Sequence, residues 1–134
     1  MTVILIRHGE TPLNRARVLQ PADTPLSNLG HQQARAMAER LRNQPISAVL
    51  ASDMTRAAQT AQPLADELGL PIEYSSVLHE RNFGDLRGQK FSDLGFDPMA
   101  SGYQPPNGES WEMFYERVAQ AFDAVSYTHL QPTR

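Results

Sequence analysis

Short apolar runs alternate along the chain with longer amphipathic stretches, and this alternation predicts an α/β fold. Three runs rich in β-branched residues are short enough for buried strands, at residues 2–7, 46–51 and 72–75. Apolar positions spaced as on one helix face predict three helices, at residues 28–43, from 53 or 55 to 68, and 110–125. The chain is therefore expected to interleave parallel strands with helices.

Local signals support the ends of these helices. Ser27 is a good N-cap for the first helix, and Gly69 is suited to the left-handed residue that ends the second. Residues 12–26 contain Pro12, Pro21 and Pro25, which predicts a loop. Two helices are expected to bury an apolar stripe, formed by Ala34, Met37, Ala38 and Leu41 in the first and by Phe114, Val118, Ala121, Phe122 and Val125 in the last.

One long stretch breaks the regular pattern. Residues 81–108 hold five Gly and three Pro, which predicts an irregular excursion. Loops of this length in compact domains are usually functional lids or disordered segments. The excursion could therefore contain residues that close over a functional site.

Composition and charge narrow the class of protein. A chain of 134 residues with 40% hydrophobic and 20% charged residues is typical of one soluble globular domain. The net charge of −3 provides no basic field for nucleic acid or an anionic membrane. Cysteine is absent, which excludes disulfides and a thiolate nucleophile. The apolar N-terminus ends at Arg7, too early for a signal peptide, so we expect a cytoplasmic protein.

The first candidate for chemistry follows the first expected strand, where residues 7–11 read Arg-His-Gly-Glu-Thr. Open α/β sheets bind ligands at the carboxyl ends of their strands. The imidazole of His8 can attack phosphorus, and the guanidinium of Arg7 can hold phosphate oxygens in a bidentate fork. The alternative is an arginine reaching to solvent beside a packed histidine.

Two further candidates follow the later strands. Arg56 lies in the first turn of the second helix, where helix termini favour anions; alternatively it pairs with Asp53 one turn earlier. Glu80 opens the excursion and could protonate a leaving oxygen if burial or negative charge raises its pKa. The alternative is an exposed carboxylate beside Arg81.

Three segments together resemble the histidine phosphatase (phosphoglycerate mutase-like) superfamily. They are Arg-His-Gly-Glu-Thr-Pro-Leu-Asn at 7–14, Ser-Asp-Met-Thr-Arg-Ala-Ala-Gln-Thr-Ala at 52–61, and Glu-Arg-Asn-Phe-Gly at 80–84. The resemblance implies that residues 1–125 form a histidine phosphatase-like domain, the N-terminal part of a three-layer sandwich whose mostly parallel central sheet is flanked by helices. It also implies an enzyme without cofactor or metal.

The resemblance assigns roles to five residues. His8 would be the phosphorylated nucleophile, and Arg7 and Arg56 would hold the phosphoryl group during transfer. Asn14 would donate a hydrogen bond to a phosphoryl oxygen, although it could instead only form a turn. Glu80 would contact the substrate and supply the proton to the leaving oxygen.

The resemblance ends at the C-terminus. Members of the family continue into an apolar strand that ends in a second His followed by Gly. Residues 126–134 lack this pattern: no apolar run precedes His129 and no Gly follows it. We expect 126–134 to be a disordered or artefactual tail and the fold to be incomplete. Losing one charge-stabilising group costs about 10²–10³ in rate, and unpaired strand edges favour aggregation, so feeble activity or poor solubility is expected.

The favoured function is hydrolysis of a small phosphorylated metabolite through phosphohistidine at His8. Mutase-type phosphoryl transfer and a non-catalytic phospholigand-binding fragment are the alternatives; a short excursion resembles the phosphatase branches more. A metallohydrolase is disfavoured because the four residues with suitable side chains lack ligand spacing, namely His8, Glu10, His31 and His79. The natural ester and the oligomeric state are left open by the sequence.

Overall fold

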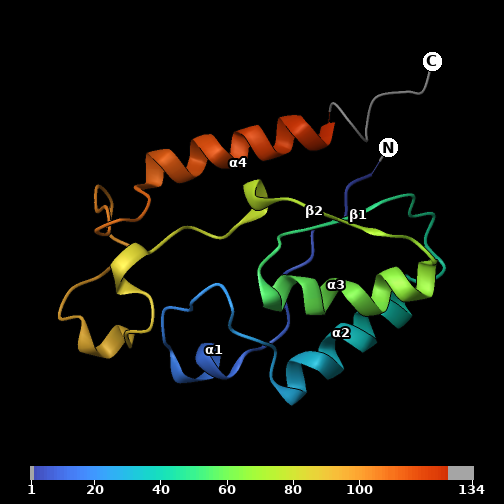
Figure 1. Ribbon diagram of the computed structural model, residues 1–134, viewed down its shortest axis with the longest axis horizontal. Helices are drawn as coiled ribbons and strands as arrows, with labels where there is room; N and C mark the ends of the chain where they lie inside the picture. Colours follow the sequence, from blue (N-terminus) through green and yellow to red (C-terminus); the bar gives the residue numbers. More distant parts are fainter. Residues whose placement is uncertain (1, 127–134) are drawn as a thin grey trace.

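The computed structural model describes residues 2–126 and has an α/β architecture (Figure 1). Its helices are α1 (Pro12–Ala16), α2 (Asn28–Leu41), α3 (Thr55–Leu68) and α4 (Trp111–Val125). Its strands are β1 (Val49–Ala51) and β2 (Ile72–Tyr74). Three short 3₁₀ turns complete the order, η1 (Ser76–Leu78), η2 (Gly84–Leu86) and η3 (Phe91–Asp93). The predicted fold class is confirmed.

The two strands lie side by side and parallel in the middle of the molecule. Val49 pairs with Ile72 and Ala51 with Tyr74, and α3 is the crossover that joins the strands. Helix α3 packs against both strands, and α2 packs against α3. Figure 1 shows α4 on the opposite side of the strands, where it contacts η1. The arrangement is helix, sheet, helix, as expected for this part of a sandwich.

The strand predicted at residues 2–7 is not formed. Val3, Ile4 and Ile6 are each more than 40% exposed, and Leu5 is 91% exposed. A strand exists only where a neighbouring chain segment completes its hydrogen-bond ladder, and no described segment pairs with 2–7. The apolar pattern indicated that this segment favours burial, but it carried no information on a neighbour. The segment still leads directly into the loop that carries His8.

The loop predicted at 12–26 is also partly wrong, because α1 forms within it. Thr11 is the N-cap: its hydroxyl accepts from the Asn14 amide, while the Asn14 side chain accepts from the Thr11 amide. Pro12 then takes the first helical position, where a missing N–H costs nothing. Arg17 ends the helix in the left-handed conformation. A capping box, with proline just inside it, therefore outweighed the prolines that favoured a loop.

The ends of the three longer helices lie close to the predicted ones, although α2 ends at Leu41 rather than at 43 and α4 begins one residue later, at Trp111. The Ser27 and Ser110 hydroxyls accept from the amides of Gly30 and Met113, and Gly69 ends α3 at a φ of 64°. Of the inward stripe expected on α4 only Ala121 is buried, and the prediction is wrong for Val118 and Phe122, which are 44% and 65% exposed. Periodicity shows which residues share a helix face, but not whether another element covers that face.

The excursion over 81–108 is a packed loop. The guanidinium of Arg81, 6% exposed, donates to the carbonyls of Pro98, Tyr103 and Glu109. It also lies 4.2 Å from the centre of the Trp111 ring, within cation–π range. One arginine thereby joins distant points of the excursion to the start of α4.

The same excursion is tied to the loop after α1. The Leu19 amide donates to the Gln89 carbonyl at 2.9 Å, and the Gly88 amide donates to Leu19 at 2.6 Å. These contacts bring the excursion to the side of the molecule that carries the loop of His8.

Candidate active site

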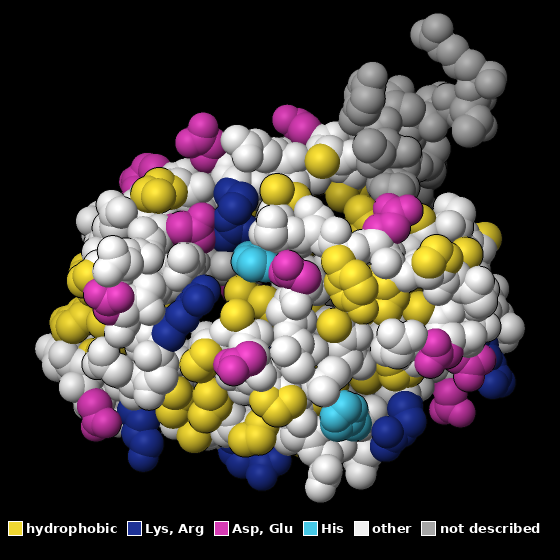
Figure 2. Space-filling model, viewed as in Figure 1, with side chains coloured by type: hydrophobic (Ala, Val, Ile, Leu, Met, Phe, Trp, Pro, Cys, Tyr) yellow, Lys and Arg dark blue, Asp and Glu magenta, His cyan; other side chains and the backbone are white. Residues whose placement is uncertain are grey.

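Four of the predicted site residues line one pocket. A cavity of about 380 Å³ lies between the N-terminal segment, β1 and α3, and its lining includes Arg7, His8, Arg56 and Glu80. Figure 2 shows charged side chains of both signs gathered with a histidine near the middle of this face, beside apolar side chains. The predicted cluster therefore surrounds a real space.

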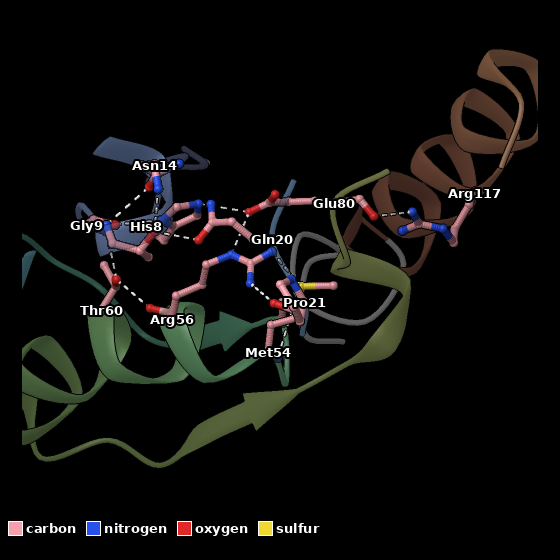
Figure 3. A network of polar contacts seen from close by, with 12 residues as sticks. His8, Gly9, Asn14, Gln20, Pro21, Met54, Arg56, Thr60, Glu80 and Arg117 are labelled. Atoms are coloured by element: carbon pink, nitrogen blue, oxygen red, sulfur yellow. Dashed lines mark hydrogen bonds and ion pairs between the residues drawn. The ribbon is translucent and has the colours of Figure 1, made fainter. Parts of the chain in front are cut away.

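His8 is held by contacts of the residue that follows it. The Gly9 amide donates to the Thr60 hydroxyl on α3 at 3.0 Å. A Cβ on Gly9 would lie 2.6 Å from the Gly30 carbonyl oxygen of α2, so glycine is required by this close approach. Nδ1 of the His8 ring lies 2.7 Å from the Gly9 carbonyl oxygen. Because a carbonyl only accepts, Nδ1 carries the hydrogen, and Nε2 is the atom directed at Glu80 (Figure 3).

Arg56 is buried in the first turn of α3, with 2% of its surface exposed. Its Nη1 donates to the Pro21 carbonyl at 2.8 Å, its Nη2 contacts the Met54 sulfur at 3.3 Å, and its Nε donates to Glu80 at 3.2 Å. The alternative pairing with Asp53 is wrong, since Asp53 forms an ion pair with His79. Arg56 is thus a fixed cation aimed at the site.

Glu80 joins the imidazole of His8 and the guanidinium of Arg56 through one atom. Its Oε1 lies 2.9 Å from His8 Nε2 and 3.2 Å from Arg56 Nε (Figure 3). Partial burial raises the pKa of Glu80, but the hydrogen bonds and charges of His8 and Arg56 outweigh it and lower the pKa to about 2. The raised pKa expected of a proton donor is therefore wrong for the ligand-free site, because two donors stabilise the carboxylate.

Arg7 and Asn14 lie at the site without joining this network. Arg7 is exposed on the pocket lining, and within residues 2–126 its guanidinium forms no hydrogen bond or ion pair. Asn14 does form the turn that the alternative required, through its capping contact with Thr11. That contact uses the carbonyl of the Asn14 side chain. Its amide hydrogens are left for another acceptor near His8, where Figure 3 places it, so the two roles are compatible.

Sequence reasoning missed three residues that support the site. Thr60 bridges the His8 loop and α3, since its hydroxyl also donates to the Arg56 carbonyl at 2.7 Å. Gln20 accepts from the Thr11 hydroxyl at 2.5 Å and lies beside His8 in Figure 3. Arg117 reaches from α4 to the main chain of Glu80 at 3.0 Å. The sequence could have indicated Thr60, because it lies one helical turn after Arg56 and therefore on the same face of the helix. No sequence pattern indicated Gln20 or Arg117.

Two kinds of feature are absent from residues 2–126. No group of three or more His, Cys, Asp or Glu side chains is arranged to hold a metal ion. No helix in this part of the chain combines the length and apolar character needed to cross a membrane. Residues 127–134, which make up the expected tail except for Ser126 and include His129, lie outside the described part of the chain.

Comparison with known proteins agrees with the geometry. The profile of the histidine phosphatase superfamily (branch 1) matches residues 3–132. The chain belongs to the histidine phosphatase superfamily. A curated Yersinia pestis protein named "Probable phosphoglycerate mutase GpmB" is 35% identical in an alignment covering 92% of this chain and 62% of that protein. The chain thus spans about 62% of the length of the curated relatives it matches.

Solved structures with this fold include phosphatases. A mycobacterial glucosyl-3-phosphoglycerate phosphatase in complex with VO3 has a TM-score of 0.81 at 28% identity, and the match covers 91% of this chain and 63% of that one. Bacillus stearothermophilus YhfR has a TM-score of 0.83 at 28% identity, covering 92% and 66%. The predicted family and fold class are confirmed by these matches.

Proposed function

We propose that this chain carries the phosphoryl-transfer half-site of a phosphomonoesterase that acts on a small phosphate ester through phosphohistidine at His8. One observation carries the proposal: an imidazole nitrogen and a buried guanidinium converge on a single carboxylate oxygen, at 2.9 and 3.2 Å. Groups that share one oxygen of a carboxylate are spaced to share an oxyanion of phosphate. The names of relatives, which include both phosphatases and a mutase, support phosphate-ester chemistry.

The proposed first step starts with a change of partner for Glu80. A phosphate dianion that enters the pocket meets Arg56 and the unengaged guanidinium of Arg7. Its negative charge beside Glu80 raises the pKa of that carboxyl from about 2. The proton between the two side chains then moves from His8 Nε2 to Glu80 Oε1. One proton transfer therefore creates both the nucleophilic lone pair and the general acid.

The bond changes follow from this arrangement. His8 Nε2 attacks phosphorus, the ester P–O bond breaks, and the leaving oxygen takes the proton of Glu80. Water next attacks phosphorus and the P–N bond breaks, with Glu80 accepting a proton from that water. The two guanidinium groups stabilise the charge on the equatorial oxygens in both steps. Phosphate leaves, and His8 and Glu80 return to their starting contact.

The variant Glu80→Gln tests this account because its two expected effects have opposite signs. Removing the carboxylate frees His8 and Arg56, so inorganic phosphate is expected to bind about 3- to 10-fold more tightly. Loss of the proton donor is expected to lower kcat for an alkyl phosphate about 10²–10⁴-fold. Calorimetric titration with phosphate and steady-state assays measure the two effects.

The exposed Glu67→Gln on α3, remote from His8 and Glu80, is the matched control and should change neither value. Weaker phosphate binding in Glu80→Gln would contradict the shared cradle. Absence of turnover in the unsubstituted protein, with phosphate binding intact, would favour the non-catalytic binding fragment. Return of the phosphoryl group to a second ester rather than to water would favour the mutase.

A further inference from the structure

All the N–H groups of the Arg117 guanidinium donate hydrogen bonds near the main chain of Glu80. Its Nη1 donates to the carbonyls of Val77 and His79 at 3.0 and 2.7 Å, and its Nη2 donates to the Glu80 carbonyl at 3.0 Å. Its Nε and the second Nη2 hydrogen bind the two carboxylate oxygens of Glu109 at 2.8 and 2.7 Å. Guanidinium has five N–H donors, and each one has a partner here. Figure 3 shows Arg117 approaching Glu80 from α4.

Glu109, which pairs with Arg117, also binds the main chain at Asn82, two residues after Glu80. Its Oε1 accepts from the Asn82 amide at 2.8 Å, and its own amide donates to the Asn82 carbonyl at 2.8 Å. The hydrogen bond from Arg117 is the main cause of the lowered pKa of Glu109, so the pair is ionised and held together at neutral pH. The Arg117 and Glu109 side chains are 19% and 14% exposed. The main chain is therefore fixed before and after Glu80.

The Glu80 carboxylate can contact His8 and Arg56 only while these hydrogen bonds of Arg117 and Glu109 hold its main chain in place. Its side chain is half exposed, and among residues 2–126 only His8 and Arg56 hold it at the site. A glutamate side chain has three rotatable bonds, so a main chain free to move would let the carboxylate leave both donors. A displacement of about 1 Å at a reacting group can cost about 10²-fold in rate.

We propose that Arg117, braced by Glu109, is a positioning residue that fixes the main chain at 77–82 so that the Glu80 carboxyl reaches His8. The inference deepens the proposed function and rests on it for the role of Glu80 as proton donor. The competing interpretation is that Arg117 only attaches α4 to η1. Under that interpretation any weakening of α4 has the same effect as loss of the guanidinium.

The first test follows the titration of Glu80 and needs no turnover. Carbon NMR of the side-chain carboxyls, with Glu80 assigned by its absence in Glu80→Gln, is expected to give a pKa near 2 in the unsubstituted protein. In Arg117→Lys, which has too few donors for the five contacts, the pKa is expected to rise toward the ordinary 4.5. Glu109→Gln, a milder change, is expected to move the pKa in the same direction by less.

The control weakens α4 and keeps every contact of the guanidinium. Ala121→Gly removes a buried methyl group and lowers helix propensity. Ala121→Gly should leave the pKa of Glu80 unchanged, even if it lowers the Tm as much as Arg117→Lys does. An unchanged titration in folded Arg117→Lys and Glu109→Gln, or an equal change in Ala121→Gly, would overturn the proposal.

A kinetic test separates this proposal from the proposed function. Arg117→Lys is expected to lower kcat for glycerol 2-phosphate about 10- to 10²-fold. For p-nitrophenyl phosphate, whose leaving group needs no proton, the loss of kcat should be smaller, because Glu80 is then needed only to take the proton of His8 and that of the attacking water. In the Glu80→Gln background the same substitution should cause no further loss. Additive losses would overturn the positioning role alone, whereas turnover independent of His8 would overturn the proposed function and leave the NMR result to decide the anchorage.

Discussion

Replacing His8 by alanine is expected to lower turnover of p-nitrophenyl phosphate by about 10³-fold or more, because the atom that forms the covalent bond is gone. Binding of inorganic phosphate should change only a few-fold, since Arg7 and Arg56 are retained. The structure motivates this split: His8 Nε2 faces the shared oxygen of Glu80, and a separate buried cation lies behind it. Steady-state kinetics and phosphate titration on the same preparation measure both quantities.

The matched control for His8 is His31→Ala. His31 lies on α2, and its side chain makes no hydrogen bond or ion pair within residues 2–126. This variant should keep the full turnover of the unsubstituted protein. Comparable activity in His8→Ala and His31→Ala would remove the nucleophile from the account.

Replacing Arg56 by methionine is expected to weaken both phosphate binding and catalysis. A cation that stabilises charge in the transition state typically contributes about 10²–10³-fold to kcat. Methionine fills much of the buried stem, but the Pro21 carbonyl loses its donor, which costs about 1–3 kcal/mol of stability. Lysine at the same position keeps the charge without the fork and should be intermediate. Phosphate titration, kcat and the urea midpoint separate the three effects.

The control for Arg56 is Arg35→Met, which removes an exposed guanidinium from α2. Its stability should stay within about 0.5 kcal/mol of the unsubstituted protein, and its kinetics should be unchanged. If Arg56→Met binds phosphate as tightly as Arg35→Met does, the buried guanidinium has no part in anion binding.

The chemistry of the site could be predicted from short segments, whereas its geometry could not. His8, Arg56 and Glu80 each follow a strand or an expected strand, so a common sheet edge indicated that they would meet. That they meet on one carboxylate oxygen is a matter of side-chain reach, which the sequence does not encode locally. The pKa of Glu80 was expected to be raised, but it is lowered. The expectation considered burial, whereas the two hydrogen-bond donors at contact distance depend on side-chain positions that the sequence does not show.

Other features were hidden because their partners are main-chain atoms. Arg117 acts on carbonyls up to 40 positions away, and every residue has a carbonyl, so no side-chain pattern marks the contact. Gly9 is a similar case, since its requirement comes from the Gly30 backbone. The segment 2–7 failed as a strand for the opposite reason, since its own residues suit a strand but no described segment completes the ladder.

The central claim is that His8 becomes covalently phosphorylated within a cradle that Arg56 and Glu80 complete. The most direct measurement is to mix the protein with p-nitrophenyl phosphate, quench it in alkali to preserve phosphohistidine, and locate the phosphoryl group by mass spectrometry of peptides. The account predicts a phosphoryl group on His8, increased in Glu80→Gln at long times because hydrolysis is slowed, and absent in His8→Ala. Turnover with no phosphoryl group on His8, or with the group on another residue, would contradict it.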